Sequence, residues 1–386
     1  MKRLINIGSI TTLSAFLVVS IPSIKLLFSN PIINFMPLFL LFGCFLVKIG
    51  HPRVVQGYNL GNFRILSVLL LFIACVIVFY VIGEYSVIDA KGVVEYIYFI
   101  AILALITLQH QDINEKVLFG LILGWAVFLS CYHILIGFSF DRSKGQHYLT
   151  YGLPVGAGLT AALIGLFTAT VKRVKIRYIV LILIILVGLL ISRGRSSLIF
   201  PCIISILYFM SGVLFAKKNK ARNLTVLTLF IGFLAAIAAL LSQLMADVAL
   251  IRRLSASASG EREEPRLEVW TKTVELIFKN PLGYGVNSYE EVLGGSYPHN
   301  MLLEGFLSFG FVGGGLLLVL VVLFFIALIR AIRRRTIDNI KIGFVALYFF
   351  LCWNTSYDLT TSYIPLSLML LIITKQYKAK KVIKLP

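Results

Sequence analysis

The sequence predicts an all-α polytopic membrane protein with about twelve transmembrane helices and a periplasmic helical cap between the ninth and tenth spans. The first observation is composition: 59% of the 386 residues are apolar, only 14% are charged, and the mean hydropathy is +0.93. A soluble domain carries about 25% charged residues. The second observation is the distribution of basic residues, and the third is one long polar segment in a chain of otherwise short connections.

Twelve apolar runs are long enough, or nearly long enough, to cross a bilayer, which takes about 20 apolar residues. The final two runs are short, and Glu95 interrupts the fourth. An uncleaved first span is favoured over a signal peptide, because no small-residue cleavage site follows the first run. The runs are 4–22, 31–47, 65–83, 94–108, 117–138, 151–171, 178–191, 198–215, 224–245, 305–329, 342–353 and 363–374.

The net charge of +19 is spread unevenly over the connections. When the loops are numbered from a cytoplasmic N-terminus, 24 of the 36 basic residues lie on one side, opposed there by only three acidic residues. This is the positive-inside pattern. It places both termini in the cytoplasm of a bacterial inner membrane protein and makes nucleic acid an improbable partner. The five cysteines lie in or beside apolar runs without metal-ligand spacing, which is typical of small buried side chains.

The long polar segment spans 246–300 and is predicted to lie outside the membrane. It separates a block of nine spans (1–245) from a block of three spans with a basic cytoplasmic tail (301–386). Pro265 suits the first turn of a helix, and apolar residues then recur at helical spacing up to Asn280-Pro281. We expect an amphipathic helix on the membrane surface with Trp270 at the interface. Asn300 is a plausible N-cap of the next span.

Several polar side chains on the outer face are candidates for substrate binding or catalysis, although each also has a purely structural explanation. Arg193 and Arg195 lie in a very tight connection between two apolar runs. An arginine in such a loop is usually an interfacial anchor, and the alternative here is that it binds an anion. Arg266 opens the external helix as a surface ion-pair partner or a phosphate ligand. His299 is a structural residue or a proton acceptor. A third external loop adds Arg142 and His147.

Five short motifs follow one another along residues 192–313: Ser-Arg-Gly (192–194), Arg-Leu-Glu-Val-Trp (266–270), Asn-Pro-Leu-Gly-Tyr-Gly (280–285), Pro-His-Asn (298–300) and Gly-Phe-Val-Gly (310–313). In this order they resemble the O-antigen ligase/polymerase family. The resemblance covers roughly residues 140–315, and the first four spans match only in being hydrophobic.

The resemblance implies a membrane glycosyltransferase that uses no metal and no cofactor, with an undecaprenyl-diphosphate-linked glycan as donor. It implies that Arg193 and Arg266 bind the diphosphate and that His299 is the catalytic base. Arg195, Arg142, His147 and Asn300 are possible accessory residues. Cations that converge on the leaving phosphate would stabilise its developing charge, and a single displacement would invert the anomeric centre. The acceptor would be lipid A–core oligosaccharide or another lipid-linked glycan.

Two alternatives to a ligase stay open at this stage. An O-antigen or exopolysaccharide polymerase would use the same donor, but the segment 142–152 looks more like ligases. A lipid-linked oligosaccharide flippase or transporter would also have many spans. Transporters usually show repeated halves and charged or broken helices at mid-membrane, whereas this sequence shows no half-to-half similarity and few mid-span charges.

Overall fold

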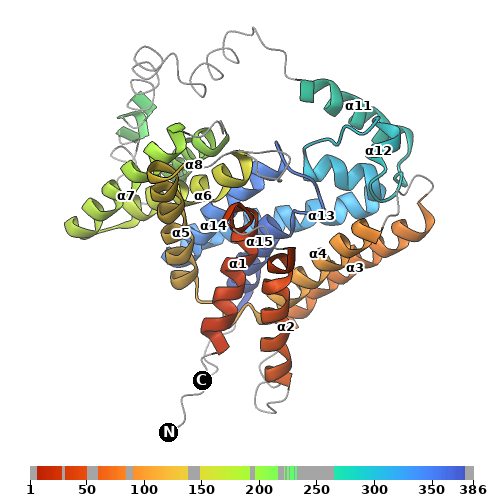
Figure 1. Ribbon diagram of the computed structural model, residues 1–386, viewed down its shortest axis with the longest axis horizontal. Coiled ribbons are helices and arrows are strands. Elements are labelled where there is room, and N and C mark those ends of the chain that lie inside the picture. Colours follow the sequence, from red (N-terminus) through yellow and green to blue (C-terminus); the bar gives the residue numbers. More distant parts are fainter. Residues whose placement is uncertain are drawn as a thin grey trace.

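The computed structural model describes residues 7–27, 31–49, 60–83, 90–137, 148–191, 196–215 and 265–378, together with residues 221, 224, 225, 227–229, 231 and 232. Within these residues every regular element is a helix (Figure 1). The predicted ninth span, 224–245, lies largely outside the described residues, as does the boundary at 245.

The helices follow the apolar runs closely. Ten of the other eleven runs coincide with one helix each, and the run 31–47 is divided between η1 and α2. By length and composition, six of the described helices (α1, α4, α5, α6, α8 and α13) are suited to cross a membrane. The all-helical, multi-pass membrane fold is therefore confirmed, while the count of twelve spans stays a prediction. The elements are α1 (Ile7–Leu27), η1 (Pro31–Phe35), α2 (Met36–Ile49), α3 (Leu60–Ile82), α4 (Ala90–Gln109), α5 (Glu115–Leu135), α6 (Tyr148–Thr168), α7 (Lys172–Ile191), α8 (Ser196–Phe215), α11 (Pro265–Lys279), α12 (Tyr289–Val292), α13 (Met301–Arg334), α14 (Ile337–Trp353) and α15 (Tyr363–Lys378).

Helix α6 lies inside the bundle and packs against α5, α7, α8, α14 and α1. Residues 151–162 of this helix are all buried. Small residues allow its neighbours to approach closely, as is common between membrane helices. Gly156, for example, lies against the Tyr348 hydroxyl and the Ser197 carbonyl, so that α14 and the start of α8 both contact the same turn of α6.

Four chain segments meet at the end of the bundle opposite α11. Lys48 at the end of α2 forms an ion pair with Asp112 in the α4–α5 connection. Lys375 near the end of α15 lies 2.9 Å from a Glu115 carboxylate oxygen, and the Gln376 amide donates to the Thr336 hydroxyl at 3.2 Å. These are segments that the charge distribution assigns to one side of the membrane, and the structure places them at one end.

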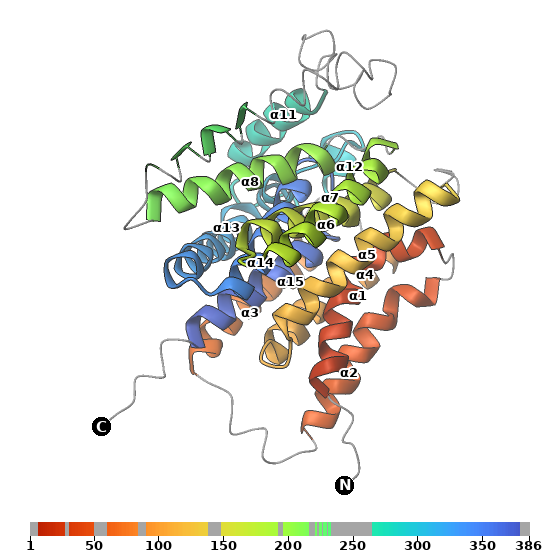
Figure 2. The same cartoon turned by 90° about the vertical axis from the view of Figure 1, so that its left-hand side faces the viewer.

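The segment 265–300 covers the other end, where α11 and α12 lie above the starts of α13 and α4 (Figures 1 and 2). Helix α11 begins and ends where Pro265 and Asn280-Pro281 predicted. The protein covers only part of the apolar face of this helix. Ile277 packs against Tyr284 and Leu307, whereas Leu267 and Phe278 are 62% and 69% exposed. Whether this exposed face meets a membrane surface stays a prediction.

Candidate functional site

Helix α13 bends sharply at Gly310, where the backbone leaves the helical conformation (φ 60°, ψ −163°). Such a break frees backbone groups that a membrane helix must satisfy elsewhere. The loop after α11 supplies the partners: Tyr284 N donates to Leu307 O at 2.9 Å and Gly285 N to Ser308 O at 3.0 Å. Phe311 N donates to Pro281 O at 2.9 Å. The Asn-Pro-Leu-Gly-Tyr-Gly motif and the glycine motif of α13 are therefore two halves of one backbone junction.

The turn that carries His299 is fixed from both sides. On its N-terminal side, the Trp270 indole N–H donates to the Pro298 carbonyl at 2.6 Å. Trp270 is half-buried, and its predicted position at the membrane interface stays a prediction. On the C-terminal side, Asn300 Oδ1 accepts from Leu302 N at 3.0 Å and from Leu303 N at 3.1 Å, which confirms Asn300 as the N-cap of α13.

His299 itself adopts a left-handed backbone conformation (φ 53°), which histidine tolerates better than most residues. Its ring lies 3.9 Å, centroid to centroid, from the ring of Tyr297. Its Nδ1 atom is buried without a hydrogen-bond partner among the described residues. An unpartnered buried ring nitrogen is available to a ligand that enters the site.

The surroundings of His299 favour its neutral form. Burial and, second, the nearby positive charge of Arg266 lower the pKa of His299 below its ordinary value of 6.5. A hydrogen bond with the backbone of Ser356 and the negative charge of Asp358 oppose this shift without reversing it. A neutral imidazole at pH 7 is the form that accepts a proton.

Arg266, in the first turn of α11, reaches the connection between α14 and α15. Its guanidinium donates to the carbonyl oxygen of Thr355. The side chain is half-buried, and a guanidinium carries five N–H donors, so one such bond leaves others for a ligand. Arg266 and His299 are 33 positions apart in the sequence, yet they contact neighbouring residues of one connection. Arg266 contacts Thr355, and His299 contacts the backbone of Ser356.

The connection 354–362 is a part of the site that the sequence analysis missed. Asp358 Oδ1 accepts from the Thr361 N–H and from the Thr360 and Thr361 hydroxyls, each at 2.8 Å. Glu304, only 1% exposed on α13, accepts from Leu359 N at 2.8 Å. The available signal was a run of nine residues, Asn-Thr-Ser-Tyr-Asp-Leu-Thr-Thr-Ser, with one acid among hydroxyls between two apolar runs.

The other predicted site residues, Arg193, Arg195, Arg142 and His147, lie outside the described residues. The helix ends that flank them are described. Ser197 at the start of α8 lies against Gly152 in the first turns of α6. The Leu149 carbonyl at the start of α6 accepts from the Tyr357 hydroxyl at 3.1 Å. These helix ends therefore lie beside the same 354–362 connection that Arg266 contacts.

Acidic residues at this site are engaged with the backbone. Within the described residues, no group of three or more His, Cys, Asp or Glu side chains could hold a metal ion. The charged groups that face the His299 ring are a guanidinium and the Asp358 carboxylate. The arrangement combines a proton acceptor with a fixed cation, which suits a reaction that deprotonates one reactant and develops negative charge on the other.

The fold and this site define a multi-pass helical membrane protein with a polar site under a helical cap at one end of the bundle. Residues 179–318 match the family model described as O-antigen ligase. The resemblance drawn from the motifs is therefore confirmed over this range, which includes all five motifs. No curated protein matches the chain.

Proposed function

We propose that the protein is a membrane glycosyltransferase, an O-antigen ligase that moves a glycan from undecaprenyl diphosphate to lipid A–core oligosaccharide. The observation that carries the proposal is the pairing of His299 with Arg266 on the 354–362 connection, inside the match to the O-antigen ligase family. The transfer is metal-independent and inverts the anomeric centre.

The reaction is a single displacement. An acceptor hydroxyl transfers its proton to the neutral imidazole of His299 while its oxygen bonds to the anomeric carbon of the donor. The bond between that carbon and the diphosphate oxygen breaks, and the electron pair leaves with the diphosphate. Arg266 then stabilises the added negative charge, since a guanidinium stays protonated at any working pH.

Arg193 is assigned the second diphosphate-binding role. The flanking ends of α7 and α8 lie against the first turns of α6, next to the connection that Arg266 contacts. Arg195, Arg142 and His147 are proposed as accessory residues at the same end of the bundle. Asn300 acts through the backbone, because its side chain is used in capping α13.

The reaction is placed on the periplasmic face of the inner membrane, with both termini in the cytoplasm. The meeting of the α2, α4–α5, α13–α14 and α15 ends opposite α11 supports this orientation. Basic connections face the cytoplasm under the positive-inside rule. The site under the cap then lies on the side where a translocated lipid-linked glycan is available.

The test is the lipopolysaccharide gel profile of a strain that lacks the gene, complemented with wild type, Arg193→Ala, Arg266→Ala or His299→Ala. A ligase predicts core without polymer in the deletion strain and in the point mutants, with long glycan accumulating on the lipid carrier. Core that bears a single repeat unit would instead identify a polymerase. A normal ladder in all three point mutants would overturn the assignment of these residues and favour transport.

A further inference from the structure

Two adjoining cavities lie beside the site without being part of it. One cavity, of about 340 Å³, is lined by polar and aromatic side chains from η1, α4 and the 354–362 connection. The other, of about 270 Å³, is a wholly apolar groove between α1, α2 and α5. Ile21 lines both, so the apolar groove and the polar cavity adjoin at this residue.

The described lining of the polar cavity offers hydrogen-bonding groups and contains no cation. Its lining includes Asn34, Glu95, Tyr98, Thr360 and Thr361, and none of its lining residues is Lys or Arg. Asn34 Oδ1 and the Tyr98 hydroxyl are buried without a partner among the described residues. Buried polar groups are nearly always hydrogen-bonded, so two orphans lining one cavity indicate a polar ligand.

These groups suit the hydroxyls of a neutral sugar. An amide oxygen and a carboxylate accept hydrogen bonds, and the tyrosine and threonine hydroxyls accept as well as donate. Thr360 and Thr361 also donate to Asp358, whose charge acts on His299. The cavity is therefore linked to the proposed base through Asp358.

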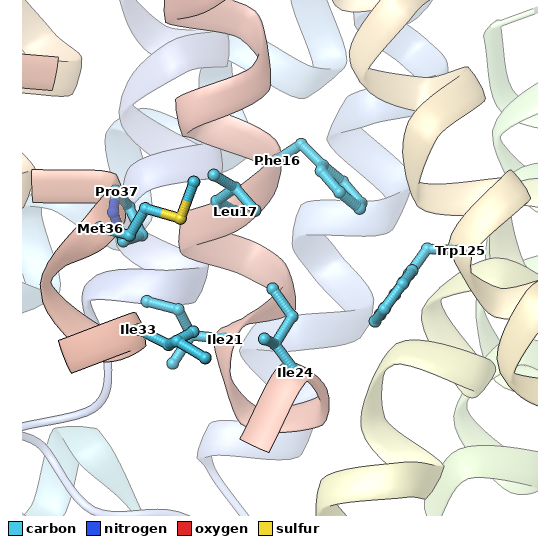
Figure 3. A pocket seen from close by; sticks show the side chains of 8 residues that line it. All are labelled: Phe16, Leu17, Ile21, Ile24, Ile33, Met36, Pro37 and Trp125. Carbon is cyan, nitrogen blue, oxygen red and sulfur yellow. The ribbon is translucent and has the colours of Figure 1, made fainter. Parts of the chain in front are cut away.

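The apolar groove suits one hydrocarbon chain. Leu17, Ile21 and Ile24 on α1 lie between Met36 on one side and Trp125 on the other (Figure 3). The Trp125 indole N–H already donates to the Ser23 hydroxyl at 2.8 Å. The ring therefore presents its apolar surface, and no group that lines the groove requires a polar partner.

We propose that the polar cavity and the apolar groove together bind the acceptor as a glycolipid, with its saccharide in the cavity and a hydrocarbon chain in the groove. This inference rests on the proposed transferase function. The donor fits less well, because its diphosphate stands between sugar and lipid, whereas here the sugar cavity adjoins the chain groove directly and no Lys or Arg is among its described lining residues. The diphosphate of the donor is instead bound by Arg266 and Arg193 under the proposed function.

The probe is an alkyl maltoside that carries a photoreactive diazirine in its chain, added to the full-length protein in nanodiscs of phosphatidylethanolamine and phosphatidylglycerol. We expect labelled peptides from α1 and α5, and at least fivefold less labelling when unlabelled alkyl maltoside competes. Farnesyl diphosphate at the same concentration should not compete. Equal competition by farnesyl diphosphate, or labelling that neither compound reduces, would overturn the proposal in favour of the donor or of bilayer lipid.

Variants of the two cavities provide the second arm. Tyr98→Phe and Asn34→Ala should each lower competition by alkyl maltoside at least threefold, and Ile24→Trp should block labelling by filling the groove. The matched control is Tyr96→Phe on the same helix, because Tyr96 is also buried with an unpartnered hydroxyl but packs on Phe99 and Phe309 outside the cavity. Equal effects in Tyr96→Phe and Tyr98→Phe would contradict the assignment.

This binding assay distinguishes the two proposals. A chain with no transfer activity that still binds alkyl maltoside through Tyr98 and Asn34 would disprove the transferase function while keeping the cavity as a glycolipid site. An active transferase whose cavity variants bind alkyl maltoside as wild type does, with an unchanged acceptor KM, would disprove the acceptor site alone.

Discussion

Gly283 packs directly on the backbone of Gly310, at the point where α13 bends. Both residues have positive φ values, 88° and 60°. A Cβ atom on Gly283 would overlap the backbone of Ser308 to Gly310, and one on Gly310 would overlap Pro281 and Leu282. The contact joins the loop that follows α11 to the helix that begins just after His299, so the two glycines determine where the cap sits over the site.

Gly310→Ala should therefore destabilise the junction. The φ and ψ angles of Gly310 fall in a region that only glycine populates readily, and forcing another residue there costs about 1–3 kcal/mol. We expect a clear fall in the midpoint of thermal unfolding of the protein in nanodiscs. Gly315→Ala is the control, since a Cβ there meets nothing within 4 Å. An equal midpoint in the two variants would show that the bend tolerates a side chain.

Trp270→Phe should lower the turnover number more than the stability. The substitution keeps an aromatic ring but removes the hydrogen bond to Pro298, a bond whose net contribution is about 0.5–1.5 kcal/mol. The turn that holds His299 then loses its restraint, and we expect kcat for transfer to fall about tenfold while the donor KM stays within about twofold. Thr271→Ala, at an exposed position of the same helix, should leave both parameters unchanged.

The pH dependence of transfer should report the charges around His299. The base works in its neutral form, so activity is lost as the pH falls through the pKa of His299, and this acidic limb should lie below the ordinary value of 6.5. Asp358→Asn removes a charge that raises the pKa and should move the limb to lower pH. Arg266→Gln removes a charge that lowers it and should move the limb of the residual activity upward. Shifts in the opposite directions would refute the assignment of the base.

Local signals were enough to predict the start and end of α11 and the N-cap of α13. Pro265, Asn280-Pro281 and Asn300 act on their own helix termini, so no distant partner is needed to interpret them. The positions of Arg266 and His299 relative to each other were not predictable from periodicity. They depend on the 354–362 connection, which follows His299 by more than 50 residues and is held by Glu304 and Asp358.

The sequence also did not predict which part of the apolar face of α11 is buried and which part is exposed. Helical spacing identifies Leu267, Trp270, Val274, Ile277 and Phe278 as a group, but not which of them a partner covers. The bend at Gly310 decides this, because it brings Leu307 under Ile277 and leaves Phe278 beside Phe311, with ring centroids 6.0 Å apart. A bend of this kind is stable only with the partner loop in place, so it is a tertiary feature.

The proposed role of His299 as the base of a metal-independent glycosyl transfer can be tested with His299→Asn. Asparagine tolerates a positive φ, so this variant should fold like wild type while lacking the base. The measurement is the transfer rate of the purified protein in nanodiscs, with a lipid-diphosphate-linked glycan as donor and EDTA present throughout. We predict an active wild type and a loss of about 10²–10⁴-fold in His299→Asn at an unchanged unfolding midpoint. A His299→Asn variant as active as wild type, or a wild type that EDTA abolishes, would contradict the account.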